Sequence, residues 1–214
     1  MKPARHQTLP AVWRGITLAV AFSLSACSTL SPTATAPPTF YVLDSPASVP
    51  QSNELNTRNT RGTTLIITPP RAAAGFDSQR IIYLREPHKL EYFASSEWVD
   101  PPARMLASML VNALAANPKF GAVVLSAGTP TGDLRLDTEI IRLQQDFRTR
   151  PSQVRFTLRA YLVDDKTRRV LASKEFDTSV ATTRDDPYGG VIAANEAVQR
   201  VLRALSDFLT EGQP

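Results

Sequence analysis

The sequence predicts an α/β domain in which two main helices pack on a mixed, largely antiparallel sheet. Three segments, 134–147, 154–162 and 170–180, carry apolar residues in the alternation that is typical of strands. Two others, Asp100–Asn117 and Pro187–Thr210, carry apolar residues at helical spacing. Turn-forming residues separate these segments. The arrangement is compatible with anticodon-binding-like α/β topologies.

Short apolar runs predict the remaining strands, because they are rich in β-branched and aromatic residues. Between two of them, Glu86-Pro87-His88 is typical of a turn. The polar segment Ser45–Gly62 predicts a long surface loop. The short strands expected are Phe40–Leu43, Leu65–Ile67, Arg80–Leu84, Lys89–Phe93 and Val123–Leu125.

The longest predicted strand changes the parity of its apolar positions near Ile140-Ile141. One extra residue at this point would keep both apolar sets facing the core, so the sequence predicts a β-bulge there. The alternative is that both faces of the strand are covered beyond Ile140. The three long strands should form an antiparallel meander.

Both predicted helices have recognisable starts. Asp100 is the expected N-cap of the first, with Pro101 and Pro102 in its first turn. The second starts after Asp185-Asp186. Its polar face mixes acidic and basic residues, which favours packing on the sheet over lying on a membrane.

The N-terminus has the layout of a secretory signal. Basic residues precede an apolar run, Gly15–Leu24, which is too short to span a bilayer. The segment Leu24-Ser25-Ala26-Cys27 resembles the lipobox of bacterial lipoproteins, in which the cysteine is acylated and becomes the new N-terminus. The alternative is an ordinary signal-peptidase site beside a small apolar cysteine.

Three parts of the chain follow from this assignment: a lipoprotein signal peptide over 1–26, a flexible tether over 27–38 and a folded domain over 39–214. In lipoproteins of this kind an Asp after the cysteine usually signals inner-membrane retention. Ser28 stands there, so we expect an anchor in the outer membrane, on its periplasmic face.

Composition argues against several functions. The formal net charge is +4, but three cations and no acid lie in residues 1–26, so the mature chain is nearly neutral and nucleic-acid binding has no electrostatic support. The single cysteine leaves no thiol after acylation. His88 is the one histidine after residue 26, and no Gly-x-Ser-x-Gly elbow is present. We expect no catalytic site, metal or cofactor.

Arginines are concentrated between positions 142 and 169. They could meet lipid headgroups or an acidic partner, but pairing with acids across the polar face of the sheet is the favoured interpretation. The expected acidic partners are Asp133, Asp137, Glu139, Asp146 and Glu175. The acidic pairs Asp164-Asp165 and Asp185-Asp186 are explained by a hairpin turn and a helix start.

One region carries a family resemblance that extends over nearly the whole mature chain. The segments Arg80-Ile81-Ile82-Tyr83, Leu90-Glu91-Tyr92 and Trp98-Val99-Asp100-Pro101 look like the signature of the ABC-type transport auxiliary lipoproteins. These are the paraquat-inducible protein C-like components of Mce-type lipid transport systems. Tyr92 and Trp98 are candidates for partner binding or for the core, whereas Tyr83 is expected in the core.

The resemblance implies a non-enzymatic lipoprotein that docks the periplasmic conduit of an Mce-type ABC system moving lipids between the inner and outer membranes. Its partners would be an Mce-domain periplasmic protein and, through it, an ABC permease and ATPase, with a homo-oligomer as a further expectation. Two alternatives stay open: a periplasmic lipid-carrying binding protein, which needs an apolar cavity, and a lipoprotein assembly factor for outer-membrane glycolipid.

Overall fold

The computed structural model describes residues 37–44, 62–126 and 131–211. The predicted signal peptide, Cys27, most of the predicted tether and the polar segment 45–61 lie outside the described residues. The chain divides into two units, 1–37 and 38–214, and the domain below belongs to the second.

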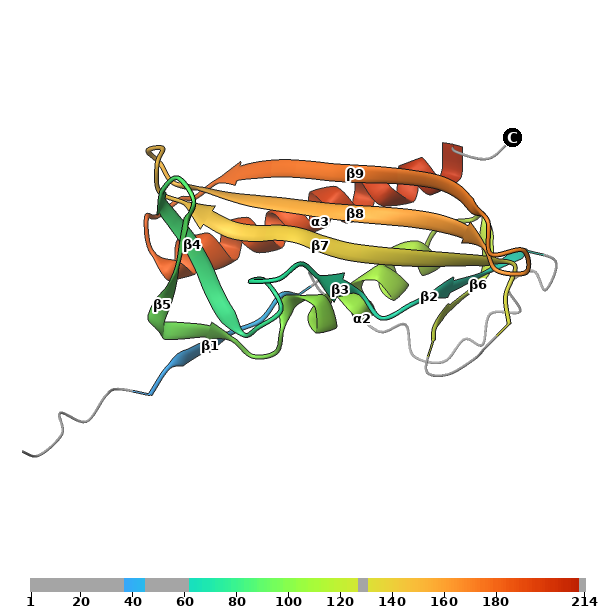
Figure 1. The fold of residues 1–214 in the computed structure, drawn as a ribbon, viewed down its shortest axis with the longest axis horizontal. Helices are drawn as coiled ribbons and strands as arrows, with labels where there is room; N and C mark the ends of the chain where they lie inside the picture. The colour runs from blue at the N-terminus through green and yellow to red at the C-terminus, as the bar shows by residue number, and fades with distance from the viewer. Residues whose placement is uncertain (1–36, 45–61, 127–130, 212–214) are drawn as a thin grey trace, which may run out of the picture. The chain divides into compact units, whose positions relative to one another are not determined.

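Within the described residues, nine strands form one mixed sheet and two helices accompany it (Figure 1). The predicted α/β fold, with two main helices and a mixed sheet, is confirmed. The elements are β1 (Thr39–Tyr41), β2 (Thr63–Ile67), β3 (Arg71–Ala72), β4 (Arg80–Glu86), β5 (Lys89–Trp98), α2 (Pro102–Ala115), β6 (Phe120–Leu125), β7 (Leu134–Asp146), β8 (Gln153–Asp164), β9 (Val170–Ala181) and α3 (Pro187–Glu211).

Strand β7 is the central strand of the sheet. One of its edges pairs antiparallel with β8, which pairs antiparallel with β9, so the predicted meander is confirmed. Its other edge is occupied in turn by β2, β3 and β4, all parallel to it. Strand β6 extends the sheet from β2, and β5 followed by β1 extends it from β4.

The predicted β-bulge in β7 is confirmed. The pairing with β8 shifts register between Ile140 and Arg142. Ile140 is buried on one side of the shift and Leu143 on the other, so the extra residue returns the apolar positions to the core.

Both helices lie on the same side of the long strands, where Figure 1 shows α3 running behind β8 and β9. The layer between helices and sheet is filled by side chains that are fully or almost fully buried, as expected for two packed layers of secondary structure. Among them are Leu65, Leu106, Phe156, Leu158 and Leu205.

The predicted N-cap of the first helix is wrong. Pro101, with φ −50° and ψ 134°, is the N-cap of α2, and no side chain caps it. The reason is that Pro101 precedes Pro102, and a residue before proline is disfavoured in the helical conformation, so Pro101 stays extended and the helix starts at Pro102. Asp100 instead pairs with Arg104, one turn along, at 3.2 Å.

Candidate functional site

An open groove of about 460 Å³ lies between the β4–β5 hairpin and the loop that follows β3. Its walls combine apolar, acidic and basic side chains, as protein interfaces with an apolar centre and a polar rim do. The groove is lined by Gly75, Asp77, Ser78, Arg80, Ile82, Leu90, Glu91 and Tyr92.

The hairpin register places the groove residues. Its turn is confirmed at Pro87-His88: proline fixes the first turn position, and His88 takes φ 64°, the combination of a type II turn. The strands pair antiparallel from this turn, with Glu86 opposite Lys89 and Ile82 opposite Tyr92. Tyr92 therefore stands beside Ile82 on the hairpin.

A cation–aromatic stack fixes the most prominent side chain of the groove. The guanidinium carbon of Arg80 lies 4.0 Å from the centroid of the Tyr92 ring. Even so, Tyr92 is 50% exposed and Leu90 48% exposed. A rigid aromatic ring presented to solvent loses little entropy on binding, which suits a contact with a partner protein.

Of the aromatic residues in the family signature, only Tyr92 faces solvent. Trp98 is 3% exposed and belongs to the core, as Tyr83 does. The Tyr83 ring packs on Phe93 with centroids 4.5 Å apart and meets the edge of Phe147. Among the signature aromatics, Tyr92 is therefore the residue whose ring is accessible at the surface.

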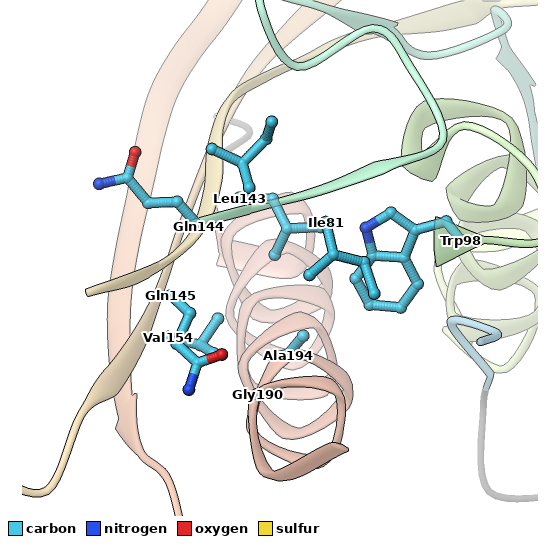
Figure 2. Close-up of a pocket in the computed structure, with 9 residues that line it drawn as sticks. Ile81, Trp98, Leu143, Gln144, Gln145, Val154, Gly190 and Ala194 are labelled. Carbon is cyan, nitrogen blue, oxygen red and sulfur yellow. The ribbon is translucent and has the colours of Figure 1, made fainter. Parts of the chain in front are cut away.

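A second, much smaller pocket lies between Trp98 and α3 (Figure 2). It measures about 10 Å³, which is the space of a single water molecule and far below that of an acyl chain. Gln145 borders it: its Nε2 donates to Ser152 Oγ at 2.9 Å, while its buried Oε1 has no hydrogen-bond partner in the described part of the chain.

The arginines of the long strands pair mainly with acids of the sheet, as the favoured interpretation held. Arg155 pairs with Asp177 at 2.7 Å, and Arg159 pairs with both Glu175 and Glu139. Asp177 is a partner that the sequence did not single out, and its pKa is lowered chiefly by its hydrogen bond to Arg155. This face therefore carries alternating charges of both signs.

The residues that could have suggested catalysis have structural roles. Asp164 accepts the backbone N–H groups of Lys166 and Thr167 in the β8–β9 turn. Asp186 accepts the Gly189 N–H at the start of α3, and this bond lowers its pKa. Within the described residues, no group of three His, Cys, Asp or Glu side chains could hold a metal ion.

No helix within residues 37–44, 62–126 and 131–211 combines the length and apolar character needed to cross a membrane. The expected lipobox, Leu24 to Cys27, lies outside these ranges, so the anchor stays a prediction.

Comparison with protein families identifies the group to which this fold and groove belong. The model of the ABC-type transport auxiliary lipoprotein component matches residues 41–206. The chain belongs to this family. The match contains the whole β4–β5 hairpin with Tyr92, and it confirms the family resemblance of the sequence.

Solved structures support the fold of this auxiliary lipoprotein. Protein XCC0632 from Xanthomonas campestris is similar over 80% of this chain and 91% of its own, with a TM-score of 0.64 and 23% identity. An uncharacterized protein covers 69% of this chain and 92% of its own, with a TM-score of 0.59 and 11% identity. No curated protein sequence matches the chain.

A more distant likeness is the PelC dodecamer from Paraburkholderia phytofirmans, which covers 68% of this chain and 88% of its own at 13% identity. Its TM-score is 0.43.

Proposed function

We propose that this auxiliary lipoprotein is anchored in the outer membrane, on the periplasmic face, through acylated Cys27. There it docks the periplasmic conduit of an Mce-type ABC system that moves lipids between the two membranes. Its direct partner would be the Mce-domain periplasmic protein, and the ABC permease and ATPase would be reached through that protein.

The main support for the proposal is the Arg80–Tyr92 stack. It occurs in a member of a family whose name implies an ABC transport system. A large aromatic ring that stays half exposed in a groove is typical of an interface anchor. Arg80 and Glu91 add polar groups at the rim, which can orient the partner.

The lipid-carrying alternative receives no support from the pocket in Figure 2, because a space of about 10 Å³ cannot take an acyl chain. The grooves around Tyr92 and between α2 and α3 are open to solvent, so neither would shield a lipid from water. Docking is the role that the described surface fits better.

The proposal is tested by affinity capture of the acylated protein from crosslinked bacterial membranes. We expect an Mce-domain protein among the crosslinked partners of the native chain. We also expect its recovery to fall on the order of tenfold in Tyr92→Ala, because hot-spot aromatics dominate interface energy. Tyr92→Phe keeps the ring and is the matched control. Capture without any Mce-domain protein would reject this function.

A further inference from the structure

A group of exposed apolar side chains lies around β1, at the point where the domain leaves its predicted tether. They come from three segments that meet there: β1 and the residue after it, the residue after β5, and the first two turns of α3. We call this group the β1 patch. Its members, each 42–55% exposed, are Phe40, Val42, Val99, Tyr188 and Ile192.

Hydrogen bonds and a ring contact hold these three segments together. The backbone N–H of Val99 donates to the Tyr41 oxygen at 2.8 Å. The ring of Tyr41 lies 6.4 Å from that of Tyr188. Asn195, one turn beyond Ile192, donates to the Val42 oxygen and accepts the Asp44 N–H. These contacts bring the three segments together around the edge strand β1, so the exposed apolar residues of the β1 patch gather in one part of the domain.

We propose that the β1 patch rests on the lipid bilayer that holds the acyl chains of Cys27. This inference rests on the anchor in the proposed function, but it assigns a membrane contact to the folded domain itself. Several large apolar side chains exposed in one part of a domain mark an interaction site. An aromatic ring with a polar tip, as in Tyr188, suits the boundary between headgroups and acyl chains.

The length of chain before the domain argues for the bilayer as occupant. Ten residues lie between Cys27 and Pro38, and the eleven steps along the fully extended chain span at most about 40 Å. As a flexible coil its mean span is about 18 Å. The β1 patch begins two residues after Pro38, so the anchor keeps it next to the membrane at high effective concentration.

The charges around the patch predict which lipids it meets. Near it, Arg104 pairs with Asp100, Arg184 with Asp186, and Arg200 with Glu196. Glu97 is opposite Phe40 in the strand register. Because these three arginines are paired with acids, they attract anionic headgroups weakly, so we expect shallow contact that does not depend on anionic lipid.

The experiment uses the acylated full-length mature protein in phosphatidylcholine vesicles that carry nitroxide-labelled acyl chains. Because acylated Cys27 has no free thiol, an introduced cysteine can be labelled selectively with a fluorophore. Ile192→Cys places the label in the patch. Val170→Cys places it on β9, where Val170 is equally apolar and 54% exposed, and is the matched control.

We expect nitroxide lipid to quench the label at 192 at least twofold and to leave the label at 170 unchanged, with or without anionic lipid. Intact mass first verifies the acyl chains. A protein without them would overturn the anchor and this inference together. An acylated protein that shows equal or no quenching at the two positions would overturn the inference alone. Crosslinks between copies at position 192 without quenching would also overturn it.

Discussion

Gly190 on α3 packs directly against the side-chain amide of Gln145 on β7, with no room for a β-carbon between them. A methyl group at position 190 would overlap Oε1 of Gln145. The amide cannot swing away freely, because its Nε2 is bonded to Ser152 Oγ and Gln145 is 2% exposed. This contact sets how closely the start of α3 approaches the sheet, beside the pocket in Figure 2.

We therefore expect Gly190→Ala to lower the free energy of unfolding by about 1–3 kcal/mol, the usual cost of overpacking. Urea denaturation measures this value. In a Gln145→Ala background the overlap is removed, and the same substitution should be neutral or stabilising, since alanine favours a helix over glycine. An equal loss in both backgrounds would show that the Gly190–Gln145 contact is not the cause.

The two signature aromatics, Tyr92 and Trp98, should differ sharply on truncation. Trp98→Ala removes a side chain that is 3% exposed and should cost about 3–5 kcal/mol of unfolding free energy. Tyr92→Ala removes one that is half exposed and should cost less than about 1 kcal/mol. Thermal and urea unfolding of both variants would measure the contrast. A similar loss in the two variants would contradict the assignment of Tyr92 to the surface.

Asp146 should make the stability of the fold sensitive to acid. Its side chain is 6% exposed, and its hydrogen bond to Arg148 is the main cause of a lowered pKa. The pKa of this carboxyl is lower in the folded than in the unfolded protein. Its contribution to the free energy of unfolding is therefore complete above the ordinary pKa of about 4 and is lost as pH falls through the lowered pKa.

Asp146→Asn should thus lower the urea midpoint at pH 7 and flatten the loss of stability in acid. Stability against pH is the measurement. Glu175→Gln, at an exposed pair with Arg159, is the matched control and should change the midpoint little. An unchanged acid slope in Asp146→Asn would contradict this role.

The anchor prediction concerns residues outside the described part of the chain. Cys27→Ser should abolish acylation, because serine offers no thiol, and should leave the precursor uncleaved or cut by another peptidase. Incorporation of radiolabelled palmitate measures this directly. Incorporation at the native level in Cys27→Ser would contradict the lipobox assignment.

The long elements of the fold could be predicted from the sequence because their patterns are local. Helical spacing gave α2 and α3, and alternation gave β7, β8 and the bulge beyond Ile140. The short parallel strand β3 could not be predicted. Arg71 and Ala72 form a strand only because β7 extends past them, and no pattern fits into two residues.

The candidate site was predicted only in part. The sequence singled out Tyr92 and Trp98 together, since both residue types serve in cores and interfaces alike. Which of the two lies in the core depends on tertiary packing. This packing buries Trp98 next to α3 and stacks Arg80 on the exposed ring of Tyr92. The β1 patch could not be predicted from the sequence either, because its members, such as Phe40 and Ile192, are far apart in the chain and come together only on folding.

Site-specific photo-crosslinking at position 92 tests the docking role most directly. A photoreactive phenylalanine analogue replaces Tyr92 in the acylated protein within intact cells, and a second protein carries it at the control position, Val170. The account predicts that position 92 crosslinks to a protein that mass spectrometry identifies as containing an Mce domain, and that position 170 does not. Failure of position 92 to crosslink an Mce-domain protein, or equal crosslinking at both positions, would contradict it.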